Sequence, residues 1–173
     1  MSITWDVEVF DQLPSTMDVA HERAVKGALS GSVVVTKEQV AGRGRRNNQW
    51  VGAPGNLYCS IILRPKIALK DIGQYSFILA VALSETVRPI LADQAIYQNK
   101  WPNDGLIDAK KFAGILIETG VTQAGELDYL NIGLGVNINN APEKRTYLNL
   151  FSENKLQPES FLEFYLQNLD EII

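Results

Sequence analysis

Apolar residues in this chain fall into short segments whose spacing alternates between that of a strand and that of a helix. Residues 16–29 carry apolar side chains at helical spacing, and the β-branched run Val33-Val34-Val35-Thr36 that follows is typical of a strand. This alternation predicts an α/β or α+β fold with a mixed, largely antiparallel sheet. Further strands are predicted at 57–63, 95–99, 112–118 and 127–136, and further helices at 74–88 and 161–169.

Length and composition restrict the class of protein. The chain has 173 residues, of which 46% are hydrophobic and 21% charged, as expected for one globular domain. A lone cysteine and a lone histidine exclude an internal disulfide and a histidine-based zinc centre. The net charge of −4 disfavours bulk electrostatic binding to DNA or RNA. Because we find neither a signal peptide nor an apolar stretch long enough to span a bilayer, we expect a soluble, cytoplasmic protein without a membrane partner.

The segment 41–56 has no readable period and contains Gly42-Arg43-Gly44-Arg45-Arg46, followed by Trp50. We interpret it as a long functional loop. Its clustered guanidiniums repel one another, so we expect disorder until an anion such as a phosphate binds. The glycines allow the backbone to approach a ligand closely, and Trp50 could stack on a planar base. A solvated basic loop and an RNA-binding loop are the alternatives.

A second polar segment, Lys100-Trp101-Pro102-Asn103-Asp104, follows a predicted strand and precedes Lys111. An Asn amide at such a strand end can read an adenine edge, and an Asp can hold Mg²⁺. Lys111 lies just before an apolar strand, where a lysine can meet an anion in a partly dry site. The plain alternative is a turn at Asp104-Gly105.

Two further segments are candidates for ligand contact. Gly133-Leu134-Gly135 places glycines on one face of a predicted strand, which leaves a flat floor for a ligand, unless the strand is simply bulged. The hydroxyls of Ser15 and Thr16 stand at a helix start, where they either cap the helix or meet a polar ligand atom. His21 is expected to be solvated and Cys59 to be a small core residue.

Taken together, the order and spacing of these motifs resemble the catalytic domain of biotin–protein ligases over about residues 5–140. The resemblance implies the fold of the biotin/lipoate ligase family. It also implies a two-step reaction with biotin, ATP and Mg²⁺. Biotin and ATP first form biotinyl-5′-AMP and pyrophosphate, and the biotinyl group then passes to a lysine of a biotin carboxyl carrier protein, such as the acetyl-CoA carboxylase subunit.

The resemblance assigns roles to the matching residues. It implies that Arg45 and Lys111 are catalytic and that Asp104 is the best candidate for a Mg²⁺ ligand. The residues implied to bind biotin are Ser15, Thr16, Met17, Gln39, Arg43, Gly44, Arg45, Lys111 and Gly114. Those implied to bind ATP or the adenylate are Arg43, Arg45, Trp50, Asn103, Asp104, Lys111 and Asn137.

This chain departs from the family pattern at two of its motifs. Met17 stands where the family usually has Asn, so one polar contact is expected to be missing. Asn47 stands where a glycine is usual, which is expected to stiffen the loop. We find neither a preceding helix-turn-helix segment nor the family's small C-terminal β-barrel, so we expect a single catalytic domain over 1–173 and no repressor function on DNA.

Three alternative functions remain open from the sequence. Lipoate or octanoate transfer would use the same fold with another acid. A non-catalytic remnant would bind biotin or its adenylate without releasing pyrophosphate. An RNA-binding module would lose affinity steeply with salt and ignore biotin. Whether the chain forms a homodimer is also open.

Overall fold

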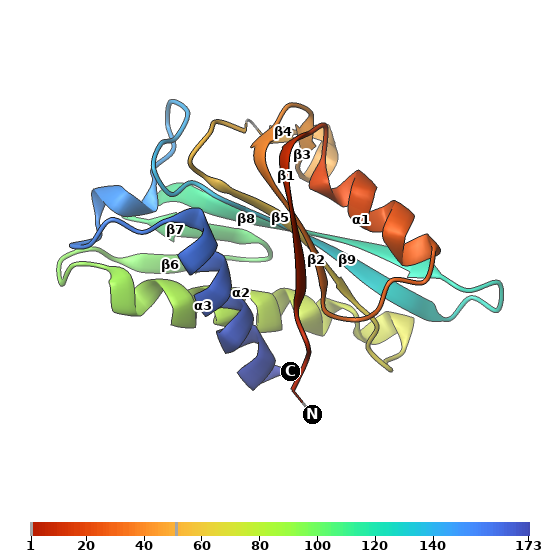
Figure 1. The fold of residues 1–173 in the computed structure, drawn as a ribbon. Coiled ribbons are helices and arrows are strands. Elements are labelled where there is room, and N and C mark those ends of the chain that lie inside the picture. The colour runs from red at the N-terminus through yellow and green to blue at the C-terminus, as the bar shows by residue number, and fades with distance from the viewer. Residues whose placement is uncertain (1, 51) are drawn as a thin grey trace.

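A mixed sheet of seven strands, in the order β1-β2-β5-β9-β8-β7-β6, runs through the whole molecule (Figure 1). The structure is a computed structural model and describes residues 2–50 and 52–173, without the side chain of Asn47. Neighbouring strands are antiparallel except β1 and β2, which confirms the predicted fold class. The strands of this sheet are β1 (Asp6–Leu13), β2 (Ser32–Gln39), β5 (Leu57–Leu63), β6 (Tyr97–Lys100), β7 (Asp104–Ile107), β8 (Lys110–Val121) and β9 (Leu127–Val136).

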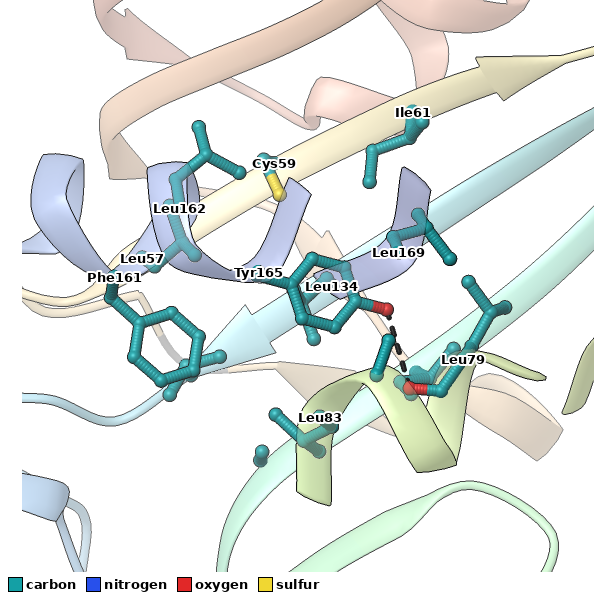
Figure 2. Close-up of a cluster of buried hydrophobic side chains, with 14 of the residues drawn as sticks. Leu57, Cys59, Ile61, Leu79, Leu83, Leu134, Phe161, Leu162, Tyr165 and Leu169 are labelled. Carbon is teal, nitrogen blue, oxygen red and sulfur yellow. Dashed lines mark hydrogen bonds between the residues drawn. The ribbon is translucent and has the colours of Figure 1, made fainter. Parts of the chain in front are cut away.

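Helices cover both faces of the sheet. On one face, α2 (Gly73–Val87) and α3 (Pro158–Ile172) pack over the main hydrophobic core, where the Tyr165 hydroxyl donates to the Leu79 carbonyl over 3.4 Å (Figure 2). On the other face, α1 (Thr16–Val25) packs on a smaller cluster. Since strand side chains alternate between faces, Ile61 belongs to the main core and Ile62 to the smaller cluster. Short 3₁₀ turns connect these elements: η1 (Arg45–Asn47), η2 (Leu69–Asp71), η3 (Arg88–Ile90) and η4 (Leu148–Leu150).

Most predicted elements are confirmed, and β5 and β9 have the predicted limits. The first helix is shorter than predicted: it ends at Val25, which is 66% exposed. Gly27 follows with a φ of +91°, a left-handed conformation that favours glycine and stops the helix. Arg64 then donates from its guanidinium to the carbonyls of Ala24 and Ala28, which satisfies the helix end.

Two strands of the seven-stranded sheet, β1 and β7, were not predicted. β1 alternates apolar and charged residues, but Val7 and Val9 remain 42% and 52% exposed, so its signal is that of a weak edge strand. The predicted turn at Asp104-Gly105 is wrong, because these residues begin β7 and pair with β8. The turn lies one step earlier, at residues 101–103.

The glycine- and arginine-rich segment forms regular structure, contrary to the expected long loop. Strands β3 (Gly42–Arg43) and β4 (Gln49–Trp50) pair across η1, with Gly42 opposite Trp50. The Gly44 amide donates to the Asn48 carbonyl over 2.7 Å. We call residues 42–50 the arginine hairpin. Its charges do not force disorder, because Arg43 is neutralised by carboxylates from elsewhere in the fold.

The two longest helices, α2 and α3, have 15 residues each. Across the described residues, no helix has the length and apolar character needed to cross a membrane.

Candidate functional site

A pocket lies where the N-terminus of α1 meets the arginine hairpin and strands β8 and β9. These segments are far apart in sequence, and the sheet order places them together. The pocket lining contains eleven of the residues predicted for the site: Ser15, Thr16, Met17, Gln39, Arg43, Gly44, Arg45, Trp50, Asn103, Lys111 and Gly114.

The predicted glycine floor is present. Gly135 pairs with Gly114 on one side and with Tyr58 on the other, so two glycines lie side by side on the same face. Strand β9 pairs with β5 residue for residue from Leu57–Val136 to Leu63–Leu130, so this part of the strand is not bulged. The floor is flat because glycines have no side chains, and not because the backbone is irregular.

Trp50 lies directly on this floor. A Cβ added to Gly135 would come within 2.5 Å of Cε2 of Trp50, and one added to Gly114 within 2.8 Å of Cζ3. The Lys111 ammonium lies 5.3 Å from the indole centroid, within the range of a cation–π contact. Because the indole occupies this space, the pocket has a volume of only about 50 Å³. Sites for small molecules usually have several hundred Å³, so the pocket in this conformation is smaller than such a site.

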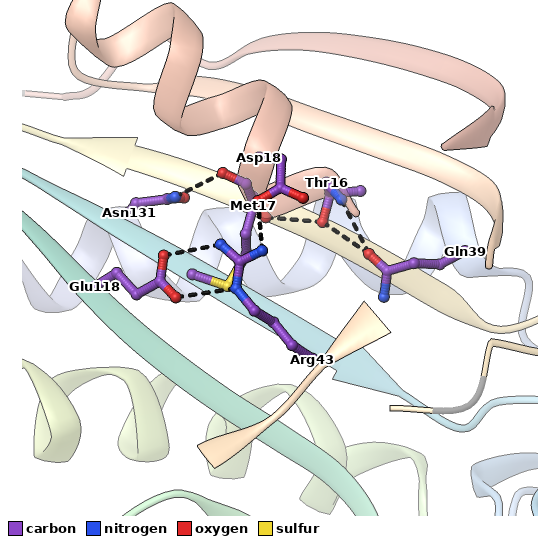
Figure 3. Close-up of polar contacts among 8 residues, drawn as sticks. Thr16, Met17, Asp18, Gln39, Arg43, Glu118 and Asn131 are labelled. Carbon is purple, nitrogen blue, oxygen red and sulfur yellow. Dashed lines mark hydrogen bonds and ion pairs between the residues drawn. The ribbon is translucent and has the colours of Figure 1, made fainter. Parts of the chain in front are cut away.

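The start of α1 is built around Gln39 rather than a side-chain cap. Gln39 Oε1 accepts from the Thr16 amide over 3.0 Å and from the Thr16 hydroxyl over 3.3 Å, and the Thr16 and Ser60 hydroxyl oxygens are 2.8 Å apart (Figure 3). Ser15 is the N-cap residue but makes no capping bond, contrary to the plain capping interpretation. Its buried hydroxyl has no hydrogen-bond partner among the described residues, and Ser15 lines the pocket. A buried polar atom of this kind is suited to a ligand.

Met17 forms an apolar wall of the pocket. Its sulfur lies over Gly133, where an added Cβ would come within 2.7 Å of it. Asn131 on β9 donates from Nδ2 to the Met17 carbonyl over 2.9 Å, which ties the first turn of α1 to the sheet. The side chain of Met17 therefore adds packing where the family pattern has a polar group.

Lys111 lines the pocket and forms an ion pair with Asp104, which is not one of the lining residues; their side chains are 19% and 21% exposed. Asn103 is held between neighbours: its amide nitrogen donates to the Ile115 carbonyl over 3.2 Å, and its oxygen accepts from Arg45 over 3.0 Å. Among the described residues, no group of three or more His, Cys, Asp or Glu side chains could hold a metal ion. In this structure, Asp104 therefore pairs with Lys111, and it could provide a metal ion with no more than a single protein ligand.

Asn137 does not line the pocket. It is buried, its side chain donates to the Thr146 carbonyl over 3.1 Å, and its amide donates to the Phe112 carbonyl over 2.7 Å. These bonds tie the strand end to the segment that follows it. Asn137 thus lies outside the pocket lining, and its implied contact with adenine stays a prediction.

Sequence reasoning missed the carboxylates that surround Arg43. Its guanidinium makes a double contact with Glu118, with Nε and Nη2 each 3.1 Å from a carboxylate oxygen, and Nη1 pairs with Asp18 (Figure 3). The hydrogen bond to Glu118, with that to Asp18, raises the pKa of Arg43 further above its ordinary value. The alternation of side chains along a strand could have predicted that Glu118 lies on the same face as Gly114. No sequence pattern could have predicted the contact with Asp18, because Asp18 belongs to another element.

The family model of the biotin/lipoate A/B protein ligases matches residues 9–137. The chain belongs to this family. Over 133 residues, it is 39% identical to the bifunctional ligase/repressor BirA of Bacillus subtilis, a match that covers 76% of this chain and 40% of BirA. It is also 39% identical over 129 residues to the biotin–[acetyl-CoA-carboxylase] ligase of Paracoccus denitrificans, which covers 73% of this chain and 53% of that enzyme. The chain thus spans about half or less of the length of these relatives.

Solved structures of the ligase family agree with this assignment. The biotin protein ligase of Leishmania major in complex with biotinyl-5-AMP is 28% identical and superposes with a TM-score of 0.83, covering 96% of this chain and 74% of that one. The biotin protein ligase of Aquifex aeolicus in complex with biotin and ATP is 26% identical, with a TM-score of 0.79 and coverage of 96% and 69%. The resemblance and the fold class stated from the sequence are both confirmed.

Proposed function

We propose that this chain carries the catalytic activity of a biotin–protein ligase, which activates biotin with ATP and transfers it to a lysine of a biotin carboxyl carrier protein. One observation carries this proposal: the pocket that collects the predicted residues lies in a fold shared with a ligase that was crystallised with biotinyl-5-AMP. The names of the relatives support biotin as the acid and acetyl-CoA carboxylase as the source of the carrier.

In the first step, a carboxylate oxygen of biotin attacks the α-phosphorus of ATP. The bond from this phosphorus to the bridging oxygen breaks, and pyrophosphate leaves with the electron pair. Two anions must approach each other, so nearby cations lower the barrier by offsetting their repulsion. Arg45 and Lys111 both line the pocket and are the cations we assign to this role. Lys111 is mostly buried, which strengthens its electrostatic effect.

We assign the ureido ring of biotin to the polar start of α1. Such a ring needs matched donors and acceptors, and the free hydroxyl of Ser15 and the amide of Gln39 provide both kinds. Met17 would contact an apolar part of the ligand, because its sulfur faces the pocket floor without a polar partner. This assignment predicts one polar contact fewer than the family pattern has.

The adenine side is assigned to Trp50 and Asn103. When Trp50 leaves the glycine floor, its indole becomes available to stack on the base. Mg²⁺ would be bound mainly by the phosphates of ATP, with Asp104 as a candidate carboxylate ligand, because the described residues offer no cluster of metal ligands. Bound in this way, Mg²⁺ would neutralise phosphate charge.

In the second step, the amine of the carrier lysine attacks the acyl carbon of biotinyl-5′-AMP. The bond from this carbon to the phosphate oxygen breaks, AMP leaves, and the ammonium intermediate loses a proton to form the amide. The mixed anhydride hydrolyses in water, so the site must shelter it between the two steps. The arginine hairpin is the segment we assign to this cover, since Arg43, Gly44 and Arg45 form part of the pocket lining.

The decisive experiment is pyrophosphate release with Mg·ATP in the presence of biotin, lipoate or no acid. The proposal expects release that depends on biotin, followed by biotin transfer to a purified carrier domain. Lipoate-dependent release would retain the fold but change the substrate. Absence of release with either acid, from protein shown by circular dichroism to be folded, would contradict the proposed enzyme activity.

A further inference from the structure

Arg43 differs from the other arginines of its hairpin because carboxylates already occupy its guanidinium. Two of its nitrogens donate hydrogen bonds to Glu118 on β8, and the third donates to Asp18 on α1. Among the described residues, the side chain of Arg45 contacts the neutral amide of Asn103 and no carboxylate, so no described group neutralises its charge. The two arginines therefore have different electrostatic surroundings although both line the same pocket.

The three groups come from three separate elements. Arg43 belongs to β3, Asp18 to the first turn of α1, and Glu118 to the part of β8 beyond its pairing with β7. Within its segment, the hairpin has only the short pairing of Gly42 with Trp50 and Arg43 with Gln49. A two-stranded ribbon of this size is marginal alone, so its position depends on contacts with the rest of the fold.

We infer that Asp18 and Glu118 are positioning residues, which hold Arg43 and thereby anchor the arginine hairpin over the pocket. Arg43 then acts as the anchor of the hairpin, and Arg45, for which the described residues show no carboxylate partner, is the cation of the hairpin that meets the reacting anions. Planar guanidinium geometry suits this task, because one side chain can bind a carboxylate with two nitrogens and still reach a second one. The anchoring stands on the contacts alone, whereas its effect on the adenylate rests on the proposed ligase function.

The anchor makes a prediction that differs from direct phosphate binding by Arg43. If Arg43 bound the phosphate, removing the charge of Glu118 would free its guanidinium and tighten ATP binding. If Arg43 is the anchor, Glu118→Gln and Arg43→Gln loosen the same hairpin, and combining them adds little. A double-mutant cycle on these two residues separates the two roles.

The first readout needs neither biotin nor ATP. Trypsin cleaves after Arg45 and Arg46 when the hairpin opens, and mass spectrometry measures the rate of this cleavage. We expect Asp18→Asn and Glu118→Gln each to raise the rate roughly two- to five-fold, as for ion pairs that are partly exposed. Asp11→Asn is the matched control, because it breaks the exposed pair between Asp11 on β1 and Lys37 on β2 and should leave this cleavage unchanged.

The second readout is kinetic. Glu118→Gln should raise the KM for biotin and the share of biotinyl-5′-AMP found free in solution, with little change in melting temperature, and Arg43→Gln should not add to either effect. Unchanged trypsin cleavage in both carboxylate variants would overturn the anchor. Tighter ATP binding in Glu118→Gln would overturn it as well. If the unmodified protein makes no adenylate, the ligase proposal fails and the trypsin result alone decides the anchor.

Discussion

The indole of Trp50 rests on Gly135 so closely that no side chain could fit between them: a Cβ on Gly135 would lie 2.5 Å from Cε2 of the indole. Gly135 pairs with Gly114 on the neighbouring strand β8, and the two glycines together extend the flat surface under the indole ring. A tryptophan that fills the site in this way can exchange its place with a ligand. Three testable consequences concern this site, and a fourth concerns the core beneath it.

Gly135→Ala should displace Trp50 from the floor. The added methyl leaves no room for the ring, and such overpacking costs about 1–3 kcal/mol of stability. With Trp5 and Trp101 replaced by Phe, the fluorescence spectrum of Trp50 should shift to the red as the ring enters water. Gly73→Ala is the control, since an added Cβ there meets nothing within 4 Å. An unshifted spectrum in Gly135→Ala would show that Trp50 does not lie on the floor.

Arg45→Gly should release the intermediate. It removes a cation that pairs with no carboxylate in the part of the chain that the structure describes, and a charge-assisted hydrogen bond contributes about 1.5–3 kcal/mol, so release should rise by about ten-fold or more. Biotinyl-5′-AMP in the filtrate of single-turnover reactions measures this. The neighbouring Arg46→Gly serves as control, because Arg46 is exposed and has a φ of 55°, which glycine tolerates well. Equal release from both variants would contradict the role of Arg45.

Lys111→Ala should lower single-turnover adenylation by on the order of 10²-fold, the usual effect of losing one electrostatic contact to a transition state. This variant also leaves Asp104 without its ion-pair partner and is therefore expected to lose stability. The double variant Lys111→Ala/Asp104→Asn removes that unpaired charge. It should regain stability in urea unfolding while adenylation stays low. Recovery of adenylation together with stability would place Lys111 outside the reaction.

The core predicts loss of stability at alkaline pH. Burial raises the pKa of the Cys59 thiol from 9.0 to about 12, and burial also raises the pKa values of Tyr97 and Tyr165. Above pH 9, the unfolded chain loses protons that the folded chain keeps, so the free energy of unfolding should fall as pH rises from 9 towards 12. One group contributes a slope of about 1.4 kcal/mol per pH unit.

Urea unfolding at half-unit steps from pH 8 to 11 measures this slope. In Cys59→Ala, the decline should begin about one pH unit later, near the ordinary pKa of tyrosine. The same onset in both proteins would show that Cys59 does not ionise on unfolding as proposed. At pH 8, the thiol should react with alkylating reagents only after unfolding, because it is buried and protonated.

Local patterns were enough to predict the elements whose side chains repeat with a clear period. The limits of β5 and β9 were predicted correctly, and Pro89 correctly marks the end of α2. The turn at Asp104-Gly105 was predicted wrongly, because Asp104 pairs with Lys100 and with Gly114 and so begins a strand between two neighbours. β1 was missed because it is an exposed edge strand, whose side chains show no strong burial pattern.

The candidate site, like the fold, was predicted only in part from the sequence. The resemblance to the ligase family, which rests on the order and spacing of the motifs, pointed to residues that gather at one pocket, among them Ser15, Arg43 and Lys111. Only the tertiary structure shows that Asn137 is used to tie backbone segments together and that Asp104 first serves Lys111. Sequence spacing cannot tell whether a polar group faces a ligand or a protein partner.

Composition and periodicity by themselves thus determined the fold class and the chemical groups available to the site. The sheet register decided which of these groups meet, because it places Glu118 of β8 on the same face as Gly114 and near Asp18 of α1. Repulsion among the arginines predicted disorder when only the local segment was considered. Carboxylates contributed by α1 and β8 neutralise Arg43, and ion pairs across the fold are invisible to any local pattern.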